Sequence, residues 1–389
     1  MYPRIRTEQI NNVIQKSEYR LFSFSSLARS LEGVMSDAEY LDRLVDDESF
    51  AAYLEAEFGP AESFSVERHA EGHSNETLFV TWGDRELVVR RPPPGETADT
   101  AHDVLREHRV VSALADTSVP VPETLRSCDD PSVLGSDFYL MERANGDVLR
   151  GEEPARFGTP EARRRAGGAL VDTLAAIHGV DYETVGLAEF GRPSGYTERQ
   201  VDRWTAQLEW AFETTASVRE VPEIVAVGEW LADNVPTEHD ETLVHGDFKL
   251  DNVMYGPGTP PEIVAVFDWE LSTLGDPLAD LGWLLLFWYD EGDPEPAMPD
   301  LMSTFTAREG YPTRMELVER YETTTGRTFE HERFYRALAA YKMAALGEMF
   351  LARYRNGDSD DPLYPKMEAR VPALAERALA YVNGETNRL

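Results

Sequence analysis

The stretch LVHGDFKLDNVMY, residues 243–255, carries five polar side chains between two short apolar runs. The apolar ends are typical of strands, and the polar middle, with its glycine, is typical of a loop. Asp247 and Asn252 lie five positions apart in this loop. A second apolar run, EIVAVFDW at residues 262–269, begins after GPGTPP and carries Asp268 near its end. The two runs predict a hairpin that returns Asp268 toward Asn252.

This hairpin would gather oxygen-bearing side chains in a pattern that suits a hard, hydrated cation. Mg²⁺ usually takes one or two protein oxygens and completes its shell with water and phosphate oxygens. Phosphoryl transfer needs such a metal clamp, a base that orients the acceptor hydroxyl, and a positive group on the nucleotide phosphates. The pattern therefore predicts two oxygen ligands for Mg²⁺ with a further carboxylate beside them.

Length and composition restrict the classes of protein that the chain can be. It has 389 residues, too many for one ordinary core, so two lobes or domains are expected. Its single cysteine, Cys128, excludes a disulfide framework or a cysteine-based zinc site within one chain. The longest apolar run near a motif, residues 281–289, is far shorter than the roughly 20 residues of a membrane span. We therefore expect a cytoplasmic protein with no membrane partner.

The chain is strongly acidic and poor in lysine. It has 71 acidic and 37 basic residues, for a net charge of −34, and only four of the basic residues are lysines. Such a surface is typical of a halophilic protein, because molar salt screens the self-repulsion of the surface. An acidic face for a cationic partner would leave the same pattern. No basic stripe is present, so nucleic acid is not expected as the main ligand.

Residues 1–34 depart from this pattern, with five basic and three acidic residues. They lack the continuous apolar segment of a secretory signal, and the acidic composition of the rest of the chain begins just after Met35. We expect them to be an atypical extension or an upstream translation artefact. The rest of the chain is expected to divide into a nucleotide-binding N-lobe at 35–143 and a catalytic, substrate-binding C-lobe at 144–389.

The spacing of apolar residues changes along the chain. Residues 37–58 have helical spacing, and the alternating runs at 63–91 are typical of hairpins. A helix is expected at about 100–114, followed by two further strands that end in FYLMER at 138–143. From about residue 160 the spacing is mainly helical. We expect an α+β fold with a β-rich N-lobe and a mainly helical C-lobe.

Several motifs together resemble a known family. D-x-K-x-x-N at 247–252, followed by a strand ending in Asp268, resembles the catalytic loop and metal-binding aspartate of the two-lobed protein-kinase-like fold. The H-G-D form, with D-W-E and DPLADLGWLL after it, is similar to the aminoglycoside phosphotransferase family of small-molecule kinases. Other segments resemble the kinase-like domain that some proteins carry fused to an acyl-CoA dehydrogenase, namely VVRRPPPGETADTAHDVLREHRVVSAL, VPVPETL, GRPSGYTERQVDRW, EGYPTRMELVERY and YKMAAL. The resemblance covers about residues 60–357.

The resemblance implies roles for the residues of the opening stretch. Asp247 matches the aspartate that orients the acceptor hydroxyl, and Asn252 and Asp268 match the Mg²⁺ ligands. Lys249 matches a catalytic-loop lysine that would touch the γ-phosphate, with a surface loop lysine as the alternative. The activity implied is transfer of the γ-phosphate of ATP to an alcohol.

The N-lobe motifs match the family less closely. EGHSNET at 71–77 has the place of a phosphate-covering loop, although an ordinary hairpin turn would have the same sequence. We predict that three of its residues contact the nucleotide: Gly72, Ser74 and Asn75. LVVR aligns Arg90 with the phosphate-pairing lysine, and an arginine fork binds phosphate through two hydrogen bonds. A slip of one residue would put Arg91 there instead.

Other side chains are expected to support these groups. Glu107, in the next helix, is the expected partner of Arg90, with an exposed helix glutamate as the alternative. Backbone groups from Glu142 to Ala144 are expected to bind the adenine edge. Three residues are expected to be structural: Asp276 as a helix N-cap, and Asp280 and His245 as loop braces. His178, on an apolar helix, is expected to be a core residue.

The acceptor is expected to be a small molecule with a hydroxyl group. The dehydrogenase-linked subfamily points to a hydroxyacyl-CoA or a hydroxy acid. Three arginines would then meet CoA phosphates or a carboxylate, although helix salt bridges are equally open to them: Arg192, Arg199 and Arg203. An amino-alcohol or aminoglycoside kinase is one alternative, and a catalytically silent nucleotide- or metabolite-binding module is another. A protein kinase is not favoured, because no APE-like segment lies between Asp268 and Asp280.

Overall fold

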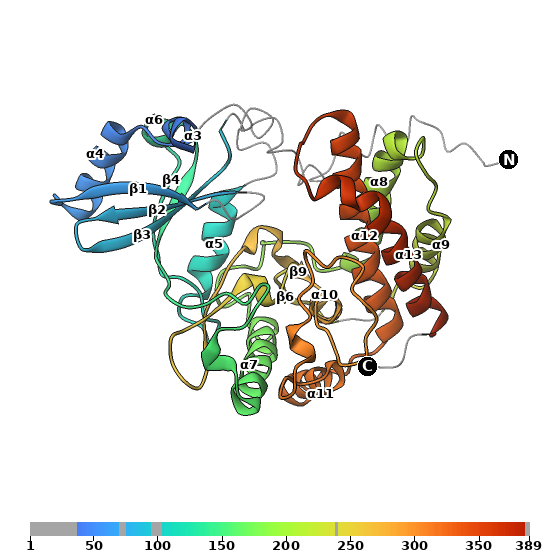
Figure 1. Cartoon of the computed structure of the whole chain (residues 1–389). Helices are drawn as coiled ribbons and strands as arrows, with labels where there is room; N and C mark the ends of the chain where they lie inside the picture. The colour runs from blue at the N-terminus through green and yellow to red at the C-terminus, as the bar shows by residue number, and fades with distance from the viewer. Residues whose placement is uncertain (1–36, 70–74, 95–102, 238–239, 386–389) are drawn as a thin grey trace.

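The computed structural model describes residues 37–69, 75–94, 103–237 and 240–385. Two lobes lie side by side, a sheet-bearing N-terminal lobe and a larger helical C-terminal lobe (Figure 1). The predicted α+β, two-lobed, protein-kinase-like fold is therefore confirmed. The predicted extension at residues 1–34 lies outside the described residues.

The N-terminal lobe is built on a five-stranded antiparallel sheet in the order β1-β2-β3-β5-β4. The strands are β1 (Phe64–His69), β2 (Glu76–Trp82), β3 (Arg85–Arg91), β4 (Thr124–Cys128) and β5 (Phe138–Glu142). Its helices are α3 (Asp37–Leu44), α4 (Asp47–Phe58), α5 (Val104–Leu114) and α6 (Pro131–Leu134). Side chains of α3, α4 and α6 pack on one face of the sheet, and α5 packs on the other.

The sequence spacing over 37–58 predicted one helical segment, and the structure has two helices there. The first ends at Leu44, and Asp46 is the N-cap of the second, accepting a hydrogen bond from the Ser49 amide at 2.8 Å. An N-cap residue has extended rather than helical backbone angles, so it interrupts the helical path.

The C-terminal lobe is mainly helical, as predicted. Its helices are α7 (Pro160–His178), α8 (Tyr196–Thr215), α9 (Pro222–Asp233), α10 (Pro277–Leu286), α11 (Arg314–Thr325), α12 (Glu332–Asn356) and α13 (Met367–Asn383). Short 3₁₀ turns are η1 (Ala155–Phe157), η2 (Leu250–Asn252), η3 (Trp269–Leu271), η4 (Phe305–Ala307) and η5 (Tyr364–Lys366). Helix α12 packs against α8, α10 and α13, so it is buried on most of its faces. None of the helices in the described residues is long and apolar enough to cross a membrane.

Two short antiparallel pairs lie between the helices and carry the opening stretch. Strand β6 (Thr242–Val244) pairs with β9 (Thr273–Gly275), and β7 (Val253–Tyr255) pairs with β8 (Ile263–Val266). The second pair is the predicted hairpin. The Phe267 amide donates to the Asn252 carbonyl at 2.8 Å. This pairing brings Asn252 and the residue that precedes Asp268 side by side.

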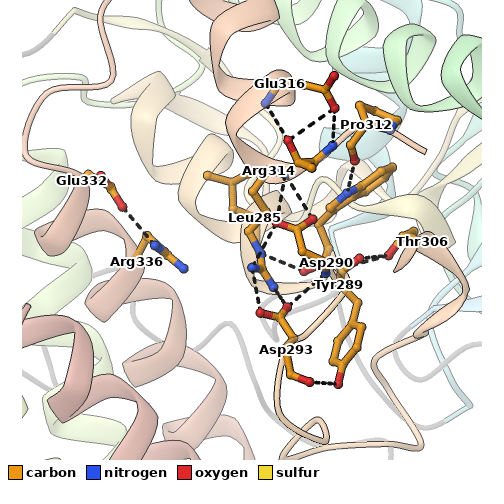
Figure 2. A network of polar contacts seen from close by, with 12 residues as sticks. Leu285, Tyr289, Asp290, Asp293, Thr306, Pro312, Arg314, Glu316, Glu332 and Arg336 are labelled. Carbon is orange, nitrogen blue, oxygen red and sulfur yellow. Dashed lines mark hydrogen bonds and ion pairs between the residues drawn. The ribbon is translucent and has the colours of Figure 1, made fainter. Parts of the chain in front are cut away.

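A buried arginine ties the loop after α10 to the start of α11 (Figure 2). Arg314 is 5% exposed, and its Nε donates to the carbonyls of Leu285 at 3.2 Å and Trp288 at 3.0 Å. Its terminal nitrogens contact the carboxylates of Asp290 and Asp293. The guanidinium therefore satisfies one carbonyl in the last turn of α10 and one just beyond the helix, and it neutralises two acids of one short loop.

We expect Arg314→Met to lower the free energy of unfolding by about 3 kcal/mol, because it leaves partly buried carboxylates without their counter-ion. Chemical denaturation followed by circular dichroism measures this change. The matched control is Arg320→Met, because Arg320 makes a half-exposed pair with Asp172. A pair of that kind is worth about 1 kcal/mol or less. Equal losses in the two variants would contradict the role given to Arg314.

Candidate active site

The loop that follows β6 is fixed by a carboxylate of α10. Asp280 accepts hydrogen bonds from the amides of His245 at 2.6 Å and Gly246 at 2.9 Å. His245 Nε2 lies 2.8 Å from the Phe267 carbonyl. Gly246 has φ +83°, and a Cβ there would lie 2.6 Å from the Leu271 carbonyl, so the turn requires glycine. The predicted bracing roles of Asp280 and His245 are confirmed.

The carboxylate of Asp247 is held from several directions. Its Oδ2 accepts hydrogen bonds from Lys249 Nζ at 2.6 Å and Asn252 Nδ2 at 2.9 Å. Its Oδ1 accepts one from Trp283 Nε1 at 2.7 Å. Burial raises the pKa of Asp247, but the ammonium groups of Lys249 and Lys342 outweigh it and hold that pKa below the usual value. The carboxylate is therefore ionised at neutral pH and fixed in orientation.

Lys249 is not an exposed loop lysine. Its side chain is 16% exposed, and its ammonium is bonded to Asp247. Burial lowers the pKa of Lys249, but Asp247 and Asp251 more than compensate, so the group keeps its charge. The structure thus brings Asp247, Lys249 and Asn252 together in one loop.

A cavity of about 370 Å³ lies between the two lobes, beside this loop. Its apolar lining comes from both lobes and includes Phe79, Val88, Val111, Met141, Met254 and Val266. Its polar lining includes Arg90, Glu107, Asn252 and Asp268. The segment 142–146, which joins the lobes, also borders it. An apolar slot with a few convergent polar groups has the character of a nucleotide or cofactor site.

Arg90 and Arg91 lie on opposite faces of β3 because side chains alternate along a strand. The Arg90 guanidinium faces the cavity and forms two hydrogen bonds with Glu107 of α5, each 3.3 Å long. Glu107 is 2% exposed, so the alternative of an exposed helix glutamate is wrong. Arg91 lies beneath α3 and α6, where it donates to the carbonyls of Leu44 and Leu134. The register places Arg90, not Arg91, in the cleft.

Two oxygen donors of the cavity fit a divalent cation. The side-chain nitrogen of Asn252 donates to Asp247. The side-chain oxygen of Asn252, Oδ1, is therefore the atom that can act as a metal ligand. Asp268 Oδ1 accepts no hydrogen bond from any described residue and lies 3.7 Å from Arg90 Nη2. Burial, followed by the nearby Glu270 carboxylate, raises the pKa of Asp268 well above its usual value. This acidic environment is one that a bound cation would relieve, so these residues fit Mg²⁺.

Asp268 also has an unusual backbone. Its φ is +63° and its ψ +58°, in the left-handed region that few residues other than glycine adopt. Such a conformation costs on the order of 1–3 kcal/mol unless the surroundings impose it. The turn into η3 imposes it here and directs the chain away from β8 immediately after the predicted ligand.

Some predicted nucleotide contacts are placed differently or lie outside the description. Gly72 and Ser74 lie outside the described residues. The Asn75 side chain does not line the cavity, and its carbonyl lies 3.4 Å from Arg90 Nη1. Glu142 lines the cavity, and its carboxylate pairs with Arg85. The amides of Glu142 and Arg143 donate to the carbonyls of Glu123 and Glu86. Both amides are thus already paired within the protein, and the predicted contact of this segment with adenine stays a prediction.

The remaining structural predictions are confirmed. Asp276 is the N-cap of α10, accepting a hydrogen bond from the Leu278 amide at 3.0 Å. His178 is buried in the C-lobe core, with its Nδ1 2.7 Å from the Tyr321 hydroxyl.

Sequence reasoning missed three residues of the site. Trp283 and Lys342 lie in the quoted motifs DPLADLGWLL and YKMAAL, yet nothing in those motifs indicated a contact with the loop of Asp247. Glu270 lies close enough to Asp268 and Arg90 to affect both pKa values. Its signal was the D-W-E motif, which places a second acid two positions after Asp268.

Variants of Arg90 and Arg91 test which of the two arginines faces the cavity and contacts a nucleotide. We expect Arg90→Met to weaken Mg·ATP binding by roughly 10- to 150-fold, because charged hydrogen bonds are worth about 1.5–3 kcal/mol. Arg91→Met is expected to lower stability and leave nucleotide affinity near the wild-type value, since the hydrogen bonds of Arg91 within the described part of the chain go to carbonyls of its own lobe. Calorimetric titration with thermal unfolding of both variants measures this. Loss of affinity in Arg91→Met alone would reverse the assignment.

A small sheet-bearing lobe, a helical lobe and an Asp-Lys-Asn loop beside the cleft are together the features of the protein-kinase-like fold. The chain belongs to the phosphotransferase enzyme family, whose family model matches residues 65–317. The predicted resemblance is confirmed, including its dehydrogenase-linked branch.

Similar proteins are found both among curated sequences and among solved structures. Acyl-CoA dehydrogenase family member 11 of Gallus gallus is 35% identical over 323 residues, which cover 82% of this chain and 40% of the relative. The chain thus spans less than half the length of that relative. A structure from Ralstonia eutropha, itself only provisionally assigned as an aminoglycoside phosphotransferase, is 30% identical, with a TM-score of 0.75 over 87% of this chain and 99% of the other. The GDP complex of aminoglycoside 2'-phosphotransferase-IIIa, 16% identical, has the same fold, with a TM-score of 0.58 and coverage of 89% and 99%.

Proposed function

We propose that this protein is an ATP-dependent small-molecule kinase that transfers the γ-phosphate to a hydroxyl group. The observation that carries the proposal is the arrangement of Asp247, Asn252 and Asp268 around one end of the β7–β8 hairpin, with Arg90 3.7 Å from Asp268. A catalytically silent module would not need to retain all of these groups. We place the reaction in the cytoplasm, where ATP and Mg²⁺ are supplied.

In this proposal Asp247 accepts a hydrogen bond from the acceptor hydroxyl and takes its proton as the phosphoryl group is transferred. Lys249 stands beside Asp247 and neutralises charge that develops on the transferred group. Arg90, held by Glu107, binds the nucleotide phosphates. The transfer is direct and in line, with no phosphoenzyme, because catalysis of this reaction rests on positioning and charge stabilisation.

Asn252 and Asp268 are the proposed ligands of Mg²⁺. When bound, Mg²⁺ supplies a charge clamp on the phosphate oxygens. Among the described residues, no three His, Cys, Asp or Glu side chains gather to hold a metal. Mg²⁺ does not need such a cluster, since it uses one or two protein oxygens where phosphate completes the shell.

We propose a hydroxyacyl-CoA or a hydroxy acid as the acceptor. The curated relative carries the name acyl-CoA dehydrogenase family member 11, and Arg203 of α8 supplies a cation on the C-lobe side, close enough to Lys342 to lower its pKa. An amino-alcohol or aminoglycoside would require acidic groups there instead. Arg199 donates to the carbonyls of Ser194 and Arg192 and so braces its own turn, which removes it from the proposed contacts with CoA.

The proposal is tested with γ-labelled ATP, and with GTP in parallel, in Mg²⁺ at low and molar KCl. The acceptor panel contains hydroxyacyl-CoAs, free hydroxy acids and amino-alcohols including aminoglycosides. We expect label on a hydroxyacyl-CoA or hydroxy acid, with a higher rate in molar KCl if the acidic surface is an adaptation to salt. Label on amino-alcohols alone would overturn the acceptor assignment. Tight Mg·ATP binding without transfer to any acceptor would favour the silent module.

A further inference from the structure

One lysine of the C-lobe core reaches the loop of Asp247 from the far side. Lys342 is on α12, and its Nζ donates to the Gly246 carbonyl at 2.6 Å. The same ammonium lies 3.8 Å from the ring centroid of Trp283 on α10 and 5.6 Å from that of Trp204 on α8. A cation over an indole face is attracted by the ring's negative quadrupole, and more strongly when both are desolvated.

Trp283 connects this cation to the proposed base. Its Nε1 donates to Asp247 Oδ1 at 2.7 Å, while Oδ2 is bonded to Lys249 and Asn252. Trp283 therefore orients Oδ1, the carboxylate oxygen of Asp247 that neither Lys249 nor Asn252 binds. An ammonium above the indole draws electron density from the ring and makes its N–H a stronger donor.

The surroundings indicate that Lys342 acts on the loop rather than on a substrate. The cavity beside it, lined by Tyr196, Gln200 and Trp204 among others, has a volume of only about 30 Å³. That is room for about one water molecule and not for an acceptor. Among the described residues, the two nearest contacts of the ammonium are the Gly246 carbonyl and the Trp283 ring, and both lead to Asp247.

We propose that Lys342 is a positioning residue that orients the Asp247 carboxylate through the Trp283 indole and the Gly246 carbonyl. The inference rests on the proposed function, because it assigns a support for the proposed base. A buried charge is costly, and a neutral side chain of the same length would fill the space. The charge itself is therefore the property to test.

The pH dependence of the support that Lys342 gives to Asp247 follows from the charged groups around Lys342. Burial lowers the pKa of Lys342 to about 8, against the opposing effect of Asp247 on the loop and Asp280 on α10. Arg203 on α8 and Lys249 on the loop lower it further. Lys342 is thus charged below pH 8 and loses its charge as the pH rises through that value. The support for Asp247 should weaken over the same range.

The experiment compares wild type with Lys342→Met, which keeps length and removes charge, and with Lys342→Arg, which keeps charge. Lys366→Met is the matched control, because Lys366 makes only a half-exposed pair with Asp300. The first readout is the indole N–H resonance of Trp283, assigned by its loss in Trp283→Phe. We expect it to move upfield in Lys342→Met, to titrate near pH 8 in wild type, and to stay in place in Lys366→Met.

The second readout is kinetic. We expect kcat of Lys342→Met to fall by about 10- to 100-fold, because a slightly misplaced reacting group costs a factor of this size. The affinity for Mg·ATP should not change. Lys342→Arg should restore much of the rate. If Lys342→Met does not fold, the wild-type titration and Lys342→Arg carry the test. An indole resonance that is insensitive to both pH and Lys342→Met would overturn the inference, as would a shifted resonance with unchanged kcat. Because the resonance needs no acceptor, failure of the proposed kinase activity would show separately, as transfer to no acceptor with the expected resonance shifts intact.

Discussion

Asp247→Asn lowers the rate of phosphoryl transfer by about 10²- to 10⁴-fold, the range that a positioned general base supplies. The variant keeps the size of the side chain and an oxygen that can accept the Trp283 hydrogen bond. It loses the negative charge that both Lys249 and the acceptor proton require. Since Asp247 does not line the cavity between the lobes, the affinity for Mg·ATP should change little. Label transfer from γ-labelled ATP, together with calorimetric titration, measures both quantities.

This prediction separates a base from a structural acid of the same loop. Asp280→Asn is the comparison, because Asp280 binds two backbone amides and is expected to act on stability. Its loss should appear first in thermal unfolding. A variant Asp247→Asn with wild-type kcat would show that the hydroxyl proton is handled elsewhere.

Asp268→Asn is expected to have the second largest effect on the reaction. A metal ligand that helps to neutralise phosphate charge is worth several kcal/mol, so the rate should fall by roughly 100- to 1,000-fold. Asparagine tolerates the left-handed backbone found at this position, which isolates the loss of charge from a change in conformation. The measurement is the rate as a function of Mg²⁺ concentration, and the concentration for half-maximal rate should rise.

A control variant at another carboxylate shows whether removal of any acidic side chain changes the Mg²⁺ dependence of the rate. Asp172 lies on α7 and makes a half-exposed pair with Arg320, far from any role in the cleft. Asp172→Asn should leave the Mg²⁺ dependence as it is in wild type. If Asp268→Asn shows the wild-type Mg²⁺ dependence, Asp268 is not a ligand and the metal assignment of the hairpin is wrong.

The parts of the site that the sequence predicted are those formed by local structure. The β7–β8 hairpin brings Asn252 and Asp268 together over a short connection, so the apolar runs and the turn residues between them were sufficient. The same holds for Asp276, whose place before proline and an apolar run is the pattern of an N-cap.

The parts that the sequence could not predict depend on register and on distant packing. Side chains alternate along β3, so the sequence alone leaves open whether Arg90 or Arg91 faces the cleft. The structure answers this through packing between elements, since Arg90 pairs with Glu107 of α5 and Arg91 contacts the carbonyls of Leu44 and Leu134. Lys342 is almost a hundred residues from Gly246 in the chain, yet their atoms are 2.6 Å apart. A contact of that kind follows from how α12 packs on α10 and leaves no pattern in the residues themselves.

The central claim is that the cleft binds a Mg·nucleotide between Arg90 and the pair Asn252 and Asp268. Calorimetric titration of the wild-type protein with ATP, with and without Mg²⁺, tests it without knowledge of the acceptor. The account predicts saturable binding at one site per chain, strengthened by Mg²⁺, with this strengthening lost in Asp268→Asn and kept in Asp247→Asn. Absence of ATP binding at any Mg²⁺ concentration, in both low and molar KCl, would contradict it.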